Sequence, residues 1–298
     1  MFHKVLIGVD GRDGGRDAIA LARDLGGARA QFVLANAVGG TVPGRAGSLA
    51  LAASCRYAKA LLDQERGAAG IAGRTITVCD GSPGQALHEL AVGEGADLVV
   101  VGAGHRRHLS RLLLGDDALD VADRPPCAVA IAPAGYRIHP DGWQTIGVGD
   151  DGSALGDHAL ALGCELGRAH HATVRALSVI GPESLSYREL MLSDWSAAAD
   201  RLEERRQTRL DAWRGVEARV TRGDPIELLR KLSDEVDLLI VGTRAQGPIS
   251  RRLNGSASRR LAAGARCALL VLPPGFKPAA VAPVPPSSDP RALAAPGC

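Results

Sequence analysis

Aromatic side chains are scarce in this 298-residue chain, in which Phe, Tyr and Trp together make up 3%. Proteins that bind single-stranded nucleic acid stack bases on aromatic rings, so this scarcity argues against a nucleic-acid partner. Net charge is also small, because 35 Lys and Arg are balanced by 33 Asp and Glu. General polyanion binding is therefore not expected, and any basic function must be local.

Long apolar runs and paired cysteine motifs are missing as well. The apolar stretch of the opening segment, MFHKVLIGVDG, is too short for a signal sequence or a membrane span, so we expect no membrane partner. We interpret this segment as a first β-strand. The cysteines lack C-x-x-C spacing, which argues against zinc and against a disulfide framework and favours a reducing cytoplasm. They are Cys55, Cys79, Cys127, Cys164, Cys267 and Cys298.

The chain does contain short apolar segments that alternate with helical patterns. Strands are predicted over residues 5–9, 32–38, 74–79, 97–102 and 127–132, and helices over about 13–25, 49–67 and 83–93, with another beginning near 116. Continuous apolarity is typical of parallel strands covered on both faces. The pattern therefore predicts an α/β fold with a parallel sheet and right-handed crossovers.

The same pattern then starts again. Asp10-Gly11 corresponds to Asp151-Gly152, Gly102 to Gly242 and Cys127 to Cys267, all at an offset of about 140 residues. We predict two copies of one domain, residues 1–135 and 143–273. The strands of the second copy are expected over 144–149, 173–179, 216–221, 237–242 and 267–272.

Two further segments of the second half have their own character. A helix is predicted from Trp195 to Trp213, with charges on what we interpret as a solvated face: Arg201, Glu204, Arg205 and Arg209. Residues 274–298 are rich in Pro and Ala without a helical or strand period, which indicates a flexible tail. The alternative for the tail is a ligand for a proline-binding partner.

The stretch VGTRAQGPISRRLNGS, from Val241 to Ser256, has the order of an anion site. A strand leads through a basic loop into a helix, whose first N–H groups attract negative charge. The residues expected around a phosphate are Gly242, Arg244, Gly247, Arg252, Gly255 and Ser256.

The first copy carries an altered form of this stretch, VGAGHRRHLSRLLLGD, which has the same length but a different last residue. It keeps the framing glycines, Gly102 and Gly115, but ends in Asp116 where the second copy has the hydroxyl of Ser256. A carboxylate beside phosphates would repel them, so we expect a phosphate-bearing ligand to bind the first copy much more weakly than the second, or not at all.

These residues together resemble the universal stress protein family in its tandem form. The resemblance rests on a strand ending in Asp-Gly, a Gly-x-Pro turn, and a basic loop that ends in Gly-Ser. It implies two doubly wound five-stranded parallel sheets, each in strand order 3-2-1-4-5 within a three-layer α/β/α sandwich, and ATP as the cofactor, with or without Mg. It also implies that Asp151 and Asp10 lie near a ribose and that Val179 and Val38 lie against adenine.

The resemblance is incomplete at the loops. The family's inner glycine is Ala245 in the second copy and His105 in the first. Each feature also has a plain structural alternative, since Gly-rich loops are often only turns, and Asp10 and Asp151 could simply cap helices. The clustered histidines lack metal-ligand spacing, and no nucleophile has an adjacent base.

Three functions remain open: a nucleotide-binding stress or regulatory module, a structural module that binds no nucleotide, and a slow ATP hydrolase. We expect the first. The fifth strands, Cys127 to Ala132 and Cys267 to Leu272, are apolar segments at a predicted sheet edge, and bare apolar edges promote aggregation. We therefore expect the copies to associate as an internal pseudo-dimer through these strands, as the family commonly does. A homodimer of whole chains is a further alternative.

Overall fold

The computed structural model describes residues 1–27, 29–38, 45–78, 83–103, 126–138, 142–181, 184–185, 194–243 and 257–277. The chain divides into two compact units. The first unit combines Met1–Pro140 with Thr243–Pro273, and the second contains Asp141–Gly242. We refer below to residues 1–135 as the first repeat and to residues 143–273 as the second.

The first unit is built on a mostly parallel sheet in the order β3-β2-β1-β4-β5-β10. Its strands are β1 (Lys4–Gly8), β2 (Gln31–Ala37), β3 (Gly73–Val78), β4 (Leu98–Gly102), β5 (Ala128–Ala132) and β10 (Ala268–Leu272). The first five are parallel to their neighbours, which confirms the predicted order 3-2-1-4-5. Their continuous apolar sequences fit the complete burial of β5 and of most of β4.

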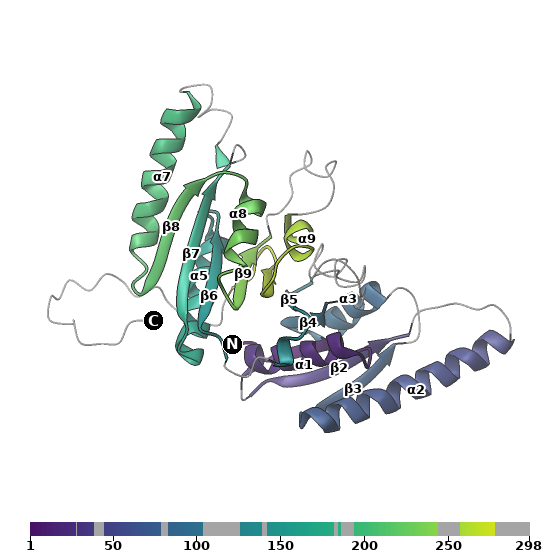
Figure 1. Ribbon diagram of the computed structural model, residues 1–298. Coiled ribbons are helices and arrows are strands. Elements are labelled where there is room, and N and C mark those ends of the chain that lie inside the picture. The colour runs from purple at the N-terminus through teal and green to yellow at the C-terminus, as the bar shows by residue number, and fades with distance from the viewer. Residues whose placement is uncertain are drawn as a thin grey trace. The chain divides into compact units, whose positions relative to one another are not determined.

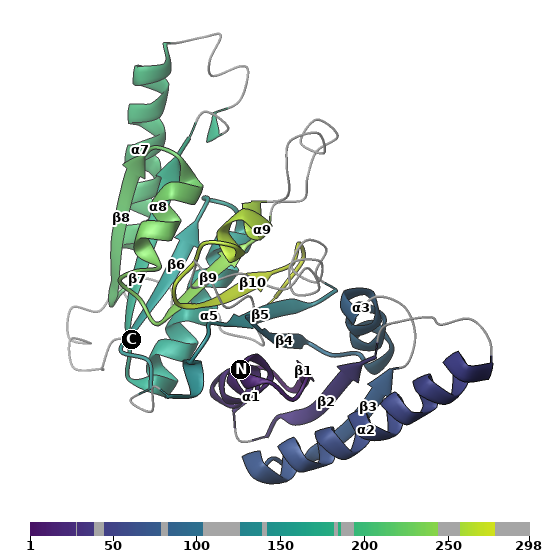
Figure 2. The same cartoon turned by 45° about the vertical axis from the view of Figure 1, so that its right-hand side comes forward.

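Strand β10, the last strand of the second repeat, pairs antiparallel with β5 (Figure 2). Leu270 lies opposite Ala130, and Val271 lies opposite Val129. All residues of both strands are buried. The edge of β5 is therefore covered by the fifth strand of the other repeat, which removes the aggregation hazard of a bare apolar edge.

Helices cover this sheet where the sequence has helical periodicity (Figure 1). They are α1 (Asp13–Gly26), α2 (Arg45–Ala69), α3 (Pro83–Glu94) and α9 (Ala257–Ala262), with a 3₁₀ turn, η1 (Tyr136–Ile138). Helix α1 packs on β1, β4 and β5, whereas α2 packs on β2 and β3. Pro83 begins α3, because the first helical position needs no N–H donor.

The second unit repeats the design with strands in the order β9-β6-β7-β8, all parallel. They are β6 (Thr145–Asp150), β7 (Thr173–Ile180), β8 (Val216–Arg222) and β9 (Leu238–Gly242). The helices are α5 (Ala154–His170), α7 (Trp195–Asp211) and α8 (Pro225–Leu232). Asp224 caps α8 by accepting from the N–H groups of Ile226 and Glu227.

The cysteines need one correction. Cys55 on α2 is disulfide-bonded, whereas Cys127, Cys164 and Cys267 form no disulfide. Spacing motifs identify metal sites and disulfide-rich scaffolds, so they gave no indication of a single bond. Burial raises the pKa of the Cys127 thiol to about 12, so this cysteine stays protonated.

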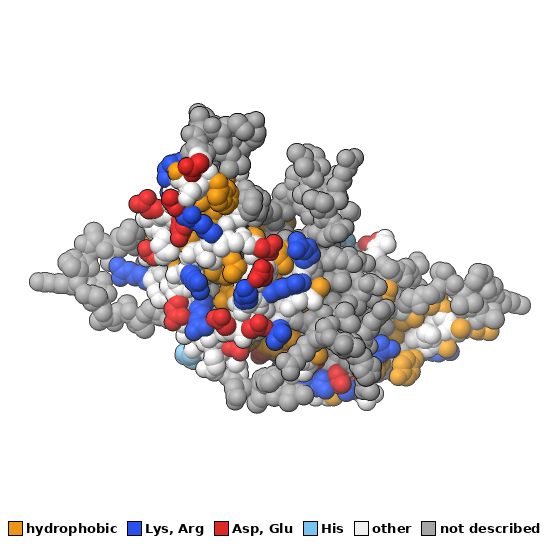
Figure 3. Space-filling model, turned by 45° about the horizontal axis from the view of Figure 1, so that its top comes forward, with side chains coloured by type: hydrophobic (Ala, Val, Ile, Leu, Met, Phe, Trp, Pro, Cys, Tyr) orange, Lys and Arg blue, Asp and Glu red, His pale blue; other side chains and the backbone are white. Residues whose placement is uncertain are grey.

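The described surface carries charges of both signs. On the face drawn in Figure 3, Lys and Arg side chains are interspersed with Asp and Glu. No helix in the described ranges has the length and apolarity needed to cross a bilayer.

Candidate functional site

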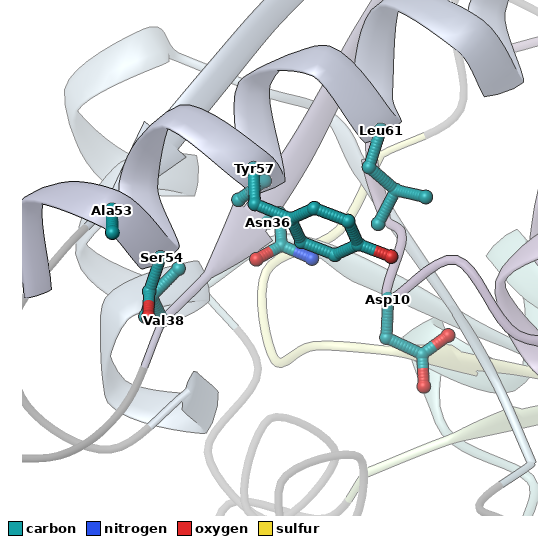
Figure 4. A pocket seen from close by; sticks show the side chains of 8 residues that line it. Asp10, Asn36, Val38, Ala53, Ser54, Tyr57 and Leu61 are labelled. Carbon is teal, nitrogen blue, oxygen red and sulfur yellow. The ribbon is translucent and has the colours of Figure 1, made fainter. Parts of the chain in front are cut away.

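A pocket of about 440 Å³ opens beyond the carboxyl ends of β1 and β2 in the first repeat (Figure 4). The strands contribute Asp10, Asn36 and Val38, and the facing wall comes from α2. Ligands of doubly wound sheets bind at this end of the strands. The pocket brings together Asp10 and Val38, two of the residues predicted for the first repeat.

Asp10 supplies a carboxylate to this pocket. Its Oδ1 accepts a hydrogen bond of 3.0 Å from the N–H of Arg12, and its side chain is 57% exposed. The turn needs Gly11, whose φ of 76° lies in the left-handed region. Asp10 therefore shapes the turn before α1, while its carboxylate stays accessible.

Asn36 is fixed by strand geometry. Its Nδ2 donates to the carbonyl of Val9 over 2.6 Å, which anchors the amide at the end of β1. Val38, two residues further along, lies on the same side of the chain because strand side chains alternate. A polar group and an apolar surface thus stand next to each other on the strand side of the pocket.

Helix α2 forms the other wall with side chains from successive turns: Ala53, Ser54, Tyr57, Ala58 and Leu61. The helix is anchored to α1 by an ion pair between Arg16 and Glu65, with Nη2 2.9 Å from Oε1. The hydrogen bond to Glu65 raises the pKa of Arg16, so this guanidinium stays charged. Figure 4 shows the Tyr57 ring and the Ser54 hydroxyl in this wall.

The strand register identifies the matching positions of the second repeat. Gly8 lies opposite Ala35, and Gly149 lies opposite Leu177, so Ser178 is the counterpart of Asn36. Their hydrogen bonds agree, since Ser178 Oγ donates over 3.1 Å to the carbonyl of Asp150, the counterpart of Val9.

The same register makes Ile180 the counterpart of Val38. The sequence comparison used Val179, which lies one residue earlier and therefore on the opposite face of the strand. Asp151 matches Asp10 closely, because its Oδ1 accepts a 3.0 Å hydrogen bond from the N–H of Ser153. The N-cap residue is Ser153 in α5 and Arg12 in α1. Neither Asp151 nor Asp10 is therefore the helix cap that the structural alternative proposed.

An arginine lies where the first repeat has its pocket. In the first repeat Leu61 lies against Gly11, and in the second Arg206 lies against Gly152. Arg206 is 6% exposed, and its Nη1 donates to Ser178 Oγ over 3.2 Å and to the Val179 carbonyl over 2.9 Å. The side chain beside the Asp-Gly turn thus belongs to a pocket wall in the first repeat, where it is Leu61, and is a buried cation in the second, where it is Arg206.

Arg209 was predicted to lie on a solvated face of α7, and its contacts show that this prediction was wrong. Its Nη2 lies 2.5 Å from Oδ2 of Asp150, whose side chain is fully buried, and its Nη1 contacts Asp157. Burial lowers the pKa of Arg209, but the two carboxylates outweigh this effect and raise it overall. Asp157 is the counterpart of Arg16, so the helix-to-helix ion pair has exchanged its charges between the repeats.

The framing glycines Gly102 and Gly242 have a packing role. A Cβ at Gly102 would overlap the carbonyl oxygen of Gly14 on α1, and a Cβ at Gly242 would lie 2.7 Å from Cδ2 of Leu155 on α5. Both glycines therefore allow a helix to approach the end of a central strand.

Most of the predicted phosphate loop lies outside the described residues. This applies to Gly115 and Asp116 in the first repeat, and in the second to Arg244, Gly247, Arg252, Gly255 and Ser256. Their phosphate contacts stay predictions. Sequence reasoning missed Asn36, the α2 wall and Arg206. The strand register could have identified Asn36, whereas nothing in the sequence distinguishes Arg206 from the other arginines of its helix.

Comparison with known proteins decides the family. The family model described as the universal stress protein family matches residues 1–133 and again residues 142–273. The chain belongs to the universal stress protein family, in its tandem form. This confirms the resemblance found in the sequence.

Individual relatives agree with this assignment. A universal stress protein of Mycobacterium tuberculosis strain H37Rv is 28% identical over 183 residues, which span 59% of this chain and 61% of that protein. A universal stress protein structure from Archaeoglobus fulgidus has a TM-score of 0.66 at 16% identity, covering 91% of this chain and 98% of its own. A functionally unknown protein from Pseudomonas aeruginosa PAO1 has a TM-score of 0.62 at 17% identity, covering 92% and 93%. At these identities the structures show the shared fold.

Proposed function

We propose that this universal stress protein is a nucleotide-binding regulatory module, for which the nucleotide is a ligand rather than a fuel. The observation that supports this best is the pocket of the first repeat, whose size of about 440 Å³ suits a small molecule. It combines the carboxylate of Asp10 and the amide of Asn36 with the apolar surfaces of Val38 and Leu61.

This combination fits a nucleoside. A carboxylate can accept hydrogen bonds from both hydroxyls of a ribose. Apolar side chains offer the flat base a surface, and the hydroxyls of Ser54 and Tyr57 offer donors and acceptors to its polar edge.

The triphosphate poses a separate requirement. In the first repeat the predicted phosphate loop ends in Asp116, and two unit charges about 5 Å apart repel by roughly 3 kcal/mol at an effective dielectric near 20. We therefore propose that the first repeat prefers a nucleoside to ATP.

A second candidate is an ATP site in the second repeat, which the loop sequence favours. Gly242, Arg244, Gly247, Arg252, Gly255 and Ser256 would hold the phosphates, with or without Mg, and Asp151 would lie near the ribose. A module that acts through protein association without any nucleotide is the alternative to both candidates.

Calorimetry with adenosine and ATP on the full chain tests the proposal. Asp10→Asn keeps the acceptor for the Arg12 N–H but removes the charge, so we expect adenosine affinity to fall about tenfold. Asp151→Asn is the matched control in the second repeat and should leave adenosine binding unchanged. Asp116→Ser should strengthen ATP binding by up to about a hundredfold.

The outcomes separate the candidates. If Asp151→Asn and Ser256→Asp weaken ATP binding while Asp10→Asn has no effect, the ATP site lies in the second repeat. If the wild-type chain binds neither adenosine nor ATP, the nucleotide proposal is wrong, and the association module takes its place.

A further inference from the structure

Arg206 marks a difference between the two repeats beside their strand ends. The strand positions that line the first pocket have direct counterparts in the second repeat: Asp151 for Asp10, Ser178 for Asn36 and Ile180 for Val38. A carboxylate, a hydrogen-bonding group and an apolar side chain are thus all kept. The helix facing them is not kept, because the side chain that lies against the Asp-Gly turn is Leu61 in the first repeat and Arg206 in the second.

The contacts of Arg206 place its guanidinium on these counterparts. Nη1 donates both to Ser178 Oγ and to the carbonyl of Val179, and Nε lies 3.3 Å from the point where Gly152 would carry a Cβ. Ser178 is completely buried, and Arg206 is nearly so. The group that Asn36 presents to the pocket in the first repeat is therefore covered by a cation in the second.

This arginine is held firmly. Two of its hydrogen bonds go to the Ser178 hydroxyl and to the Val179 carbonyl, and the hydroxyl is itself held because it donates to the carbonyl of Asp150. Hydrogen bonds from a charged group inside a protein are stronger than those between neutral groups. A ligand that needed this space would have to break both hydrogen bonds and expose the polar groups that Arg206 satisfies.

We propose that Arg206 determines nucleoside specificity between the repeats by filling the nucleoside position of the second repeat, so that only the first repeat accepts a nucleoside. This inference rests on the proposed function of the Asp10 pocket. It excludes the second candidate, an ATP site in the second repeat, because the nucleoside part of ATP would need the same position beside Asp151.

A reciprocal exchange on the full chain tests the inference, with adenosine as the probe and calorimetric stoichiometry as the readout. The wild type should bind one adenosine per chain. Arg206→Leu, which copies Leu61, should bind two, with the second site lost again when Asp151→Asn is added. Leu61→Arg should close the first pocket and abolish binding, and the double exchange should restore a single site that now depends on Asp151.

Control variants distinguish the opening of a nucleoside site in the second repeat from a general loss of folding. Arg205→Leu removes an exposed arginine from the neighbouring position of α7 and should leave the stoichiometry at one. Arg206→Met keeps the aliphatic stem without the donors and should also gain the second site, which covers the case in which the leucine variant does not fold. Circular dichroism establishes that each variant is folded.

The inference and the proposed function fail differently. If neither Arg206→Leu nor Arg206→Met gains a site dependent on Asp151, Arg206 is not what closes the second repeat. The same conclusion follows if the wild type already binds two nucleosides. A wild type without binding refutes the proposed function of the first pocket, but a site gained on removing Arg206 would still support the inference.

Discussion

The two repeats have the same strands, the same Asp-Gly turn and the same hydrogen bond between strand ends, yet they differ where a ligand would lie. The first repeat opens into a pocket lined by Asp10, Asn36 and Leu61. In the second, Arg206 covers Ser178. The backbone frame is thus repeated, whereas side chains differ both at the strand ends, where Asp150 replaces Val9, and on the helix packed against them.

The helix contacts explain how this divergence was possible. Helix α2 is anchored by Glu65 to Arg16, and α7 is anchored by Arg209 to Asp157 and to the buried Asp150. An ion pair with exchanged charges serves the same anchoring purpose. The remaining side chains of the two helices differ. In the first repeat they form the wall of a pocket, and in the second they include the buried Arg206.

The largest predicted effect concerns these anchors. Arg209→Met would leave the carboxylate of Asp150, which has 0% side-chain exposure, without its cation, and losing one partner of a buried pair costs about 3–5 kcal/mol. In the first repeat, Arg16→Met leaves the carboxylate of Glu65, with 5% side-chain exposure, without its cation. Because Arg16 itself is 46% exposed and water reaches this pair, we expect a smaller loss of about 2 kcal/mol. Urea unfolding followed by circular dichroism measures both free energies.

A second substitution identifies the cause. Asp150→Val copies Val9 of the first repeat, and combined with Arg209→Met it removes both charges. If the pair acts as described, the double variant should recover a large part of the stability lost in Arg209→Met. Equal losses in Arg209→Met and Arg16→Met would contradict the difference in burial on which this comparison depends.

Much of the frame could be predicted from the sequence, because it depends on patterns with a period. Continuous apolar runs predicted the strands, and the recurrence of Asp-Gly and Gly-x-Pro predicted two copies of one domain. The strand order confirmed by β1 to β5 followed from the family resemblance. The family resemblance also implied that Asp10 and Val38 lie near a ligand, and both residues line the pocket.

The rest depended on how helices meet strands. Arg206 and Arg209 are sequence neighbours of the exposed Arg201 and Arg205, and a helix so rich in charge gives no sign of which residues turn inward. Val179 was selected, together with Val38, as an apolar residue late in the second strand of its repeat, but the strand register makes Ile180 the counterpart of Val38. Only the strand register resolves such a shift.

A smaller effect is expected at the framing glycines. Gly102→Ala would drive a Cβ into the backbone oxygen of Gly14, which can move only with α1, so we expect a cost of about 3 kcal/mol. Gly242→Ala meets the side chain of Leu155 instead, which can rotate, and should cost about 1 kcal/mol. The same unfolding measurement ranks the two variants. A reversed order would mean that α5, not α1, is the more tightly fitted helix.

The smallest predicted effect is a pH dependence at the other end of the first sheet. The hydrogen bond from Lys4 lowers the pKa of Glu94, more than burial of the carboxyl raises it, and Arg74 adds to the lowering. Because the folded pKa lies below the unfolded one, the stabilisation is present above the unfolded value of about 4.5 and is lost as the pH falls through the folded value. Glu94→Gln should remove this dependence.

The magnitude should be under about 1 kcal/mol, since the Lys4 and Arg74 side chains are both partly exposed. The measurement is the difference in unfolding free energy between pH 7 and pH 3, which should be smaller in Glu94→Gln than in the wild type. Glu235 provides the control from the second repeat, because it is 64% exposed and lies 3.9 Å from Arg175. Glu235→Gln should leave the difference nearly unchanged, and a larger change there than at Glu94 would show that the second repeat, rather than the first, carries the acid-sensitive ion pair.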